Sequence, residues 1–410
     1  MHTPVFQNSF VKLTGERPFP WQESLFEKFI ADTIPLSANL PTGLGKTAVV
    51  AVWLCALACR PDRVPRRLAY VVNRRTVVDQ TTTEVAKWRD ALHDAGLHDA
   101  LAKLCAVPLA EDASPLAIST LRGQFADNRE WCADPARPAV IVGTVDMIGS
   151  GLLFNRYTCG FKARPHHAAL LGQDVLIVHD EAHLEPAFQT LLTTIVSEQG
   201  RCRDFRPARV LDLTATSRGA DSAFELGKED ENNSIIRRRL RATKRLQLHP
   251  LADEKALADK LTELALARRD SGRAVLVFVR SVELANRITA ELRKQQPHTE
   301  VLTGTMRGRE RDRLAEDNST FLRFLPPPSR PKEAPAPAEG TVYLVATSAG
   351  EVGVNLSADD LVCDLSTYES MAQRFGRVNR FGEPPNDATI DLVHPESFDS
   401  DDPLDAARKR

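Results

Sequence analysis

The sequence lacks the charge excess and the long apolar runs that mark two large classes of protein. Its 53 Lys and Arg residues face 55 Asp and Glu residues, so the formal net charge is −2. The longest apolar stretch, Ala48 to Cys59, is 12 residues long, well short of the roughly 18 residues that span a bilayer. These absences exclude nucleic-acid binding by overall charge and membrane insertion, and the apolar stretch predicts a buried helix.

Closely spaced cysteines are also absent. The 7 cysteines include no C-x-x-C pair, and the first ten residues carry no basic region followed by an apolar run. Neither a disulfide framework nor a secretory signal is predicted. We therefore expect a reduced, cytoplasmic protein.

The composition that remains is typical of a globular protein, with 42% hydrophobic, 26% charged and 6% aromatic residues. At roughly 150 residues per domain, 410 residues predict about two domains. Short β-rich runs separated by helix-period segments favour parallel sheets covered on both faces, and hence an α/β fold. The predicted strands lie at 35–40, 68–72, 140–142, 174–178, 210–213, 274–279, 342–346 and 361–365.

The domain boundary is predicted where strand patterns are missing. No strand is evident between about Ser217 and Gly272, where the chain is polar and strongly charged. We therefore expect a first domain over 1–245, a linker over 246–270, a second domain over 271–395 and a charged tail over 396–410. Six prolines between Pro326 and Ala338 predict a flexible insertion in the second domain, because proline lacks an amide donor.

A phosphate-binding loop is predicted by the run from Leu40 to Thr47, Leu-Pro-Thr-Gly-Leu-Gly-Lys-Thr, which follows a strand and opens an apolar helix. Gly43 and Gly45 allow the backbone to turn its N–H groups inward, and Thr42 lies in the same loop. Lys46 reaches the terminal phosphates and Thr47 supplies a hydroxyl for Mg²⁺. The first position of the strict phosphate-loop pattern is Leu40 instead of glycine, but the G-x-G-K-T core remains.

An acidic motif, Asp180-Glu181-Ala182-His183, follows the strand at 174–178. Asp180 is suited to hold Mg²⁺ and Glu181 to orient the attacking water, while His183 could sense the nucleotide. A solvated helix cap is the alternative interpretation, which the pairing with the Lys46 loop disfavours.

Gln22, in Phe19-Pro20-Trp21-Gln22, carries an amide that can hydrogen-bond to an adenine edge. A helix N-terminus with a buried Trp21 is an equally good interpretation, and the two are compatible.

Basic and hydroxyl residues after the later strands complete the pattern. Arg377 and Arg380, in Gln-Arg-Phe-Gly-Arg-Val-Asn-Arg (373–380), are three apart, so on a helix both guanidinium groups would converge on one anion. Ser-Ala-Gly-Glu-Val-Gly-Val-Asn (348–355) forms a glycine-containing loop after a strand. The hydroxyls of Thr144 and of Thr214-Ala215-Thr216 end two further strands. Taken singly, each segment could equally be an ordinary surface or connecting segment.

The order of these segments resembles that of superfamily 2 helicases and translocases. It runs from Gln22 through GLGKT, GTVD, DEAH, TAT and SAGEVGVN to QRFGRVNR, over about residues 18–394. Within the superfamily the chain looks most like the helicase of type I CRISPR interference, on the segments GTVDMIGSGLLF, LIVHDEAHLEP and RRRLRATKRL.

The resemblance implies two tandem RecA-like domains that close on ATP and Mg²⁺ and pull single-stranded DNA. It implies Glu181, Gln373, Arg377 and Arg380 as catalytic residues, with the two arginines as arginine fingers. The residues implied for ATP and its Mg²⁺ are Gln22, Thr42, Gly43, Gly45, Lys46, Thr47, Asp180, His183 and Gly353. Those implied for the nucleic acid are Arg74, Thr144, Thr347 and Asn355.

The sequence departs from the family pattern in two places. Asn355 stands where related enzymes usually carry Asp, which leaves a hydrogen-bonding role but not an ionic one. The metal-binding nuclease domain of the family does not fit within the 410 residues. We therefore expect a helicase with a separate HD-type nuclease, recruited by a type I CRISPR surveillance complex.

Other functions remain open from the sequence alone. The core motifs contact the backbone and do not distinguish DNA from RNA, so an RNA or DNA-repair helicase is an alternative. An ATP-gated docking module with little unwinding of its own is another. The basic stretch Arg237 to Arg245 could be a solvated linker or a contact to DNA phosphates.

Overall fold

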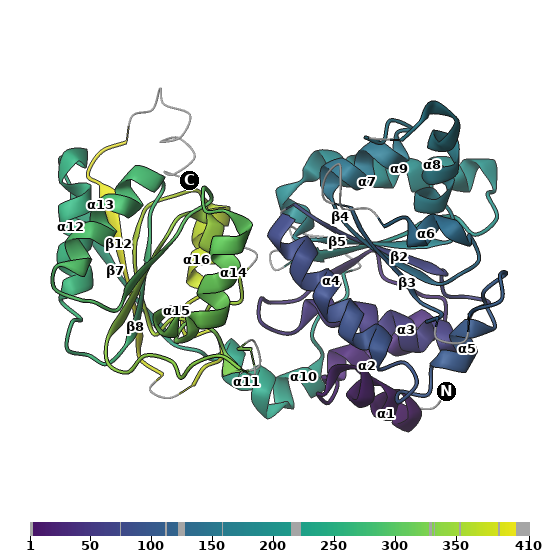
Figure 1. The fold of residues 1–410 in the computed structure, drawn as a ribbon, viewed down its shortest axis with the longest axis horizontal. Coiled ribbons are helices and arrows are strands. Elements are labelled where there is room, and N and C mark those ends of the chain that lie inside the picture. The colour runs from purple at the N-terminus through teal and green to yellow at the C-terminus, as the bar shows by residue number, and fades with distance from the viewer. Residues whose placement is uncertain are drawn as a thin grey trace. The chain divides into compact units, whose positions relative to one another are not determined.

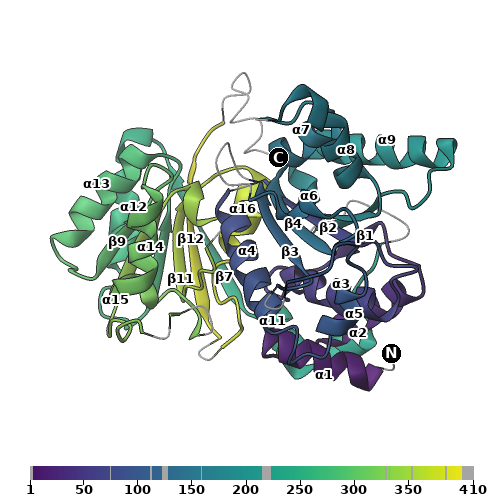
Figure 2. The ribbon, with the colours of Figure 1, turned by 45° about the vertical axis from the view of Figure 1, so that its right-hand side comes forward.

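The computed structural model describes residues 3–73, 75–110, 113–121, 128–157, 159–214, 223–327, 330–331, 333–351, 354–383 and 386–398. The chain divides into two compact units, Met1–Arg237 and Arg238–Arg410. Among the described residues, each unit contains a six-stranded sheet in which all paired strands are parallel (Figures 1 and 2). The α/β fold predicted from the sequence is confirmed.

The first sheet has the strand order β1-β6-β5-β2-β4-β3. Its strands are β1 Ser37–Asn39, β2 Arg67–Val72, β3 Ala117–Leu121, β4 Ala139–Thr144, β5 Val175–Asp180 and β6 Arg209–Thr214. The central strands β2, β4 and β5 are buried on both faces, which explains their nearly continuous apolar sequences.

Helices cover both faces of the first sheet, and Figure 1 shows α2 and α3 on one side and α7 and α8 on the other. Side chains that alternate along a strand point to opposite faces of the sheet and so belong to separate hydrophobic cores. Leu68 and Tyr70 belong to the core formed with helices α1 through α5, and Ala69 and Val71 belong to the core formed with helices α6 through α9. The helices are α1 Thr3–Thr14, α2 Pro20–Ile30, α3 Val49–Cys59, α4 Arg75–Asp90, α5 His98–Ala102, α6 Glu130–Ala133, α7 Val145–Leu152, α8 Arg164–Gly172, α9 Pro186–Cys202, α10 Lys228–Asn232 and α11 Ser234–Leu240.

The second sheet has the order β7-β12-β11-β8-β10-β9. Its strands are β7 Lys244–Leu251, β8 Ala274–Phe278, β9 Thr299–Leu302, β10 Val342–Ala346, β11 Asp360–Asp364 and β12 Ala388–Pro395. One face packs on α12 Leu257–Leu266 and α13 Val282–Arg293. The other packs on α14 Gly308–Asp317, α15 Ser319–Leu322 and α16 Tyr368–Phe375 (Figure 1).

The structure corrects the predicted linker over 246–270. β7 pairs with β12 along its whole length, and α12 packs on the second core, so this segment belongs to the second unit, which begins at Arg238 and not after 245. The sequence did not predict β7 because it is an edge strand in which polar residues interrupt the apolar ones and the side chains are exposed or half-buried. The described part of the proline-rich insertion packs on the same unit: Ala334 and Ala338 contact its core, and Arg330 Nε donates to the carbonyls of Leu322 and Leu325.

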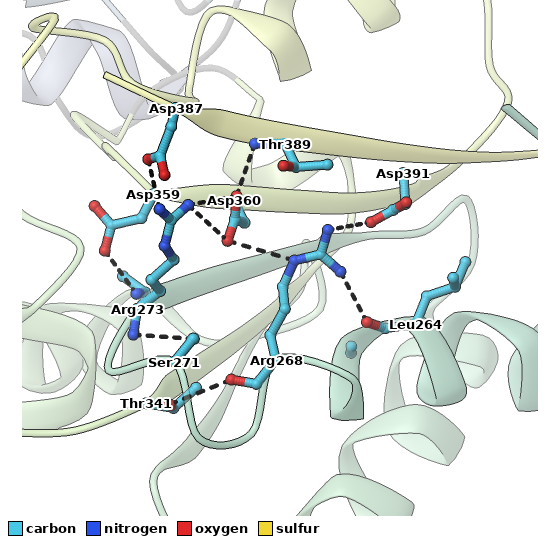
Figure 3. Close-up of polar contacts among 12 residues, drawn as sticks. Leu264, Arg268, Ser271, Arg273, Thr341, Asp359, Asp360, Asp387, Thr389 and Asp391 are labelled. Carbon is cyan, nitrogen blue, oxygen red and sulfur yellow. Dashed lines mark hydrogen bonds and ion pairs between the residues drawn. The ribbon is translucent and has the colours of Figure 1, made fainter. Parts of the chain in front are cut away.

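A buried ionic cluster links the strands of the second unit near their amino-terminal ends (Figure 3). Asp360 accepts hydrogen bonds from Arg273 Nη1 at 3.1 Å and from the backbone N–H of Thr389 at 2.7 Å, and Arg268 Nε lies 3.4 Å away. Arg268 also donates to Asp391, which pairs with His249 Nε2 at 2.7 Å. The cluster ties α12, β7, β11 and β12 together.

The apolar stretch Ala48–Cys59 forms α3, whose residues Val49 to Leu57 are all buried, as predicted. Within the described ranges, no helix is long and apolar enough to cross a membrane. The seven cysteines, all within those ranges, are free thiols.

Candidate nucleotide site

The predicted phosphate loop connects β1 to α3 and turns at its two glycines. Gly43 and Gly45 have φ angles of 85° and 75°, a region that residues with a Cβ rarely occupy. The backbone N–H of Leu40 donates to the carbonyl of Thr214 at 2.9 Å, which fixes the start of the loop against β6. A short 3₁₀ turn, Lys46–Ala48, then leads into α3, so the lysine lies at a helix N-terminus.

Lys46 and Glu181 form an ion pair at this loop. Lys46 Nζ lies 3.2 Å from Glu181 Oε1, and the two side chains are only 9% and 15% exposed. Glu181 follows the last residue of β5 and has a φ angle of 53°, which turns the chain sharply at the carboxyl end of the strand. The structure thus brings together the lysine and the acidic motif, which are 135 positions apart.

Asp180 is buried beside this ion pair. Its Oδ2 accepts a hydrogen bond from the phenol of Tyr70 at 3.0 Å, and the hydroxyl of Thr47 is a further partner of that phenol. Among the described residues, Asp180 Oδ1 has no hydrogen-bond partner although it is buried. Burial and the neighbouring Glu181 charge raise the pKa of Asp180 to about 6. The buried Asp180 carboxylate, which has one oxygen without a donor, and the Thr47 hydroxyl are both joined to the phenol of Tyr70, and they are oxygen donors of the kind that fits Mg²⁺.

His183 connects the acidic motif to β6. Its Nδ1 lies 3.4 Å from the hydroxyl of Thr214 and 3.7 Å from Glu181 Oε2. The first threonine of the TAT segment therefore lies next to the acidic motif. Residues 215 and 216 of that segment lie outside the described residues.

Gln22 lies against the phosphate loop and is 3% exposed. Its Oε1 accepts the backbone N–H of Phe19 at 2.8 Å, which caps α2, and a Cβ built on Gly45 would lie 3.6 Å from its Nε2. Trp21 is fully buried, and its backbone N–H donates to Asp230 at 2.8 Å. The helix-start interpretation of this segment is confirmed, and the amide nitrogen of Gln22 remains directed at the loop.

The two predicted arginine fingers are not on a helix, which corrects the geometry expected from their spacing. α16 ends at Phe375, and Arg377 and Arg380 lie in the turns that follow. The chain leaves the helix because the segment bridges to the core instead: the backbone N–H of Ala358 donates to the carbonyl of Arg377 at 2.8 Å. The guanidinium of Arg377 donates to the carbonyl of Glu351 through Nη2 at 2.6 Å and Nε at 3.1 Å.

Sequence reasoning missed a network of buried charged groups in this region. Arg374, 2% exposed, donates from Nε to Glu351 Oε1 at 2.8 Å and from Nη1 to Asp364 Oδ1 at 3.0 Å. The same Glu351 oxygen accepts the hydroxyl of Ser370 at 2.8 Å. This network fixes α16 to β11 and to the loop after β10. A charged residue between apolar and glycine neighbours, as at Glu351, was the available signal.

The other predicted residues occupy strand ends or lie beyond the described part. Thr144 and Thr347 are buried and follow or end β4 and β10, Gln373 is half-buried on α16, and Asn355 is half-buried in the loop after β10. Arg74 and Gly353 lie outside the described residues.

Two family models match the chain. The model of the type III restriction enzyme, res subunit, matches residues 17–218, and that of the CRISPR-associated nuclease/helicase Cas3, C-terminal, matches residues 271–383. Each match lies within one unit, and each includes motifs described above. Together with the motifs, the two matches support a superfamily 2 helicase that resembles Cas3. They likewise support an enzyme that hydrolyses ATP. No curated protein matches the sequence.

Solved structures with the same fold include T. fusca Cas3 bound to ATP, with a TM-score of 0.61 and 16% identity, over 95% of this chain and 48% of that one. S. cerevisiae Dbp5 bound to RNA and ADP BeF3 has a TM-score of 0.55 and 19% identity, over 95% and 87%. The DEAD-box helicase Mss116 bound to single-stranded RNA has a TM-score of 0.58 and 16% identity, over 95% and 73%. The chain spans about half the length of the T. fusca Cas3 chain.

Proposed function

We propose that this chain is an ATP-driven motor on single-stranded DNA that unwinds target DNA for a nuclease in type I CRISPR interference. The observation that carries the proposal is the buried Lys46–Glu181 ion pair beside the unsatisfied oxygen of Asp180. Incoming phosphates would replace Glu181 as the partner of Lys46, because they are more highly charged.

In this proposal, each residue of the loop has a separate task. The N–H groups around Gly43 and Gly45 and the adjacent Thr42 hold the phosphates, Lys46 pairs with the terminal ones, and Gln22 contacts the base. Glu181, released from Lys46, accepts a proton from the attacking water. His183 senses the bound nucleotide and transmits a change in its position to Thr214, its hydrogen-bond neighbour at the end of β6.

Asp180 and Thr47 would hold Mg²⁺, which supplies charge neutralisation for the phosphates when it is bound. The buried free oxygen of Asp180 supports this assignment. Tyr70 keeps the other oxygen of Asp180 in place through its hydrogen bond.

Arg377 and Arg380 would stabilise charge on the transferring phosphate, with Gln373 as a further catalytic residue and Gly353 near the nucleotide. Arg377 would first have to exchange its present acceptor, the carbonyl of Glu351, for phosphate oxygens. Arg74, Thr144, Thr347 and Asn355 would contact the nucleic-acid backbone.

An RNA helicase is the second candidate, and the fold shared with RNA-bound Dbp5 and Mss116 supports it. The Cas3 C-terminal match over 271–383 favours the DNA motor and a surveillance complex as recruiting partner. A docking module with little unwinding remains the third candidate, and it predicts nucleotide binding without strand separation.

ATP hydrolysis by the purified chain, measured alone and with single-stranded DNA, duplex DNA or RNA, tests these alternatives. The DNA motor predicts selective stimulation by single-stranded DNA and unwinding of a tailed duplex. Stimulation by RNA alone would move the assignment to RNA remodelling. Hydrolysis without unwinding would favour the docking module.

Glu181→Gln tests the role assigned to the acidic pair. The amide keeps a hydrogen-bonding side chain but loses the proton acceptor, so we expect bound ATP to persist while turnover falls by about 100-fold or more. A filter-binding assay alongside steady-state kinetics separates the two effects. Undiminished turnover in this variant would contradict the assignment of Glu181.

A further inference from the structure

The turn that carries Arg377 and Arg380 lies beyond the end of α16, so contacts with other segments must hold it in place. On the side that faces the core of the second unit, buried residues provide these contacts. Val378 is fully buried, and Ala358 and Arg377 to Asn379 form a short bridge through two backbone hydrogen bonds of 2.8 Å. These contacts hold Arg377 but leave the outer side of the turn, toward Arg380, without regular structure.

The outer side contacts the segment 238–244, which follows directly after the first unit. Asn386 Oδ1 accepts the backbone N–H of Thr243 at 2.8 Å and the amide of Asn379 at 2.5 Å. Asn379 Nδ2 also donates to the carbonyl of Thr243 at 3.1 Å. Two asparagines, one within the arginine turn and one after it, thus bind one residue of the joining segment.

Two more contacts join the same segment to the end of α16 and to the turn. Lys244 Nζ donates to the carbonyl of Phe375 at 2.8 Å, and the guanidinium of Arg239 lies 5.2 Å from the ring centre of Phe381. Burial, together with the nearby charge of Arg380, lowers the pKa of Lys244.

Gly382 makes the closest of these approaches. A Cβ built there would lie 2.2 Å from the carbonyl oxygen of Arg238, and its φ angle is 63°. Only glycine therefore allows the turn to pack this tightly on the joining segment.

We propose that Asn379, Gly382 and Asn386 form with residues 238–244 a linker clamp that positions Arg377 and Arg380 for ATP hydrolysis. The inference rests on the proposed function, in which the two arginines act on the transferring phosphate. The clamp residues touch no reacting group and act only by holding the turn. Because the clamp binds residues 238–244, which follow directly after the first unit, the conformation of these residues determines the position of the arginine turn.

The test compares Asn386→Ala with Asn386→Asp. Alanine removes the acceptor for Thr243 and Asn379, whereas aspartate keeps an oxygen at that position and loses only the weaker contacts to Arg241 and Thr243 Oγ1, at 3.4 and 3.3 Å. With the full chain and saturating single-stranded DNA, we expect Asn386→Ala to lower kcat by about 10- to 100-fold with KM for ATP unchanged, the cost typical of a misplaced catalytic group. Asn386→Asp should restore most of kcat.

Asn318→Ala is the matched control. Asn318 lies in the same unit, and its side chain makes two hydrogen bonds of 2.8 Å, to Glu300 and from the N–H of Phe321, that do not involve the turn. Equal losses of kcat in Asn318→Ala and Asn386→Ala, in proportion to thermal stability, would reduce the clamp to a purely structural contact and overturn the proposal.

Arg377→Ala separates failure of the clamp from failure of the proposed function. If Arg377→Ala stops turnover and Asn386→Ala does not change it, the clamp is wrong and the proposed function stands. If Arg377→Ala hydrolyses ATP at the normal rate, the arginine plays no part in hydrolysis, and the proposed function and the clamp both fail. Both also fail if no nucleic acid stimulates hydrolysis by the unaltered chain.

Discussion

Two buried ionic clusters in this protein differ in how completely their polar atoms are satisfied. In the first unit, Glu181 pairs with Lys46 and Asp180 accepts a hydrogen bond from Tyr70, and each carboxylate keeps a buried oxygen without a hydrogen-bond donor. In the second unit, Asp360 and Asp391 are each bound by two or more donors (Figure 3). A buried carboxylate oxygen without a hydrogen-bond partner costs stability, and it is retained where a bound ligand supplies the missing partner. The cluster of the second unit, whose carboxylates have their donors, instead stabilises the sheet. The comparison therefore distinguishes a site from a structural network.

The largest expected effect concerns the first cluster. Lys46→Ala removes the cation that would bind phosphates, so we expect nucleotide binding and turnover to become undetectable while the chain stays folded. Equilibrium binding of a fluorescent ATP analogue measures the first effect, and thermal unfolding measures the second. Lys260→Ala, which removes a more exposed lysine paired with Glu263, is the control and should bind nucleotide normally.

A smaller effect, on stability alone, is expected in the second cluster. Asp360→Asn removes the anion shared by the partly buried side chains of Arg268 and Arg273, each of which keeps a second carboxylate partner, so we expect a cost of about 1–3 kcal/mol. Urea unfolding should show the loss, and nucleotide affinity should not change. The exposed pair of Asp259 and Arg287 provides the control, because Asp259→Asn should cost less than about 1 kcal/mol. A loss of nucleotide affinity in Asp360→Asn would break the distinction between the clusters.

The smallest expected effect comes from two buried tyrosines, one in each unit. Tyr70→Phe removes the hydrogen bond to Asp180, and Tyr343→Phe removes one to the carbonyl of Ala265 at 3.3 Å. Each should change the free energy of unfolding by about 1 kcal/mol. Only Tyr70→Phe should also weaken the Mg²⁺ dependence of nucleotide binding, which a magnesium titration measures. Identical magnesium dependence in both variants would show that Tyr70 does not support Asp180.

The sequence predicted the central strands well and the edges poorly. All eight predicted runs overlap strands of the structure, whereas β3, β7, β9 and β12 were missed. Three of these are edge strands, whose sequences contain polar residues and lack a continuous apolar run. β12 carries Asp391 at a buried position, and only the ion pairs with Arg268 and His249 make that charge tolerable.

By itself, the sequence determined the parts of the candidate site that are local in the chain. The loop from Thr42 to Thr47 is a strand, a glycine turn and a helix start in succession, and Asp180 and Glu181 end a single apolar strand. Backbone preferences and periodicity act over such short distances, so these parts could be predicted.

Only the tertiary structure decided which distant groups meet. Tyr70 binds Asp180 across 110 positions because β2 and β5 are neighbours in the sheet, and Glu351 binds Arg374 because α16 packs beside β11. The turn after α16 is likewise set by Ala358 and by residues 238–244, which overrode the helical spacing of Arg377 and Arg380. Strand order and register create these contacts, and no local propensity encodes them.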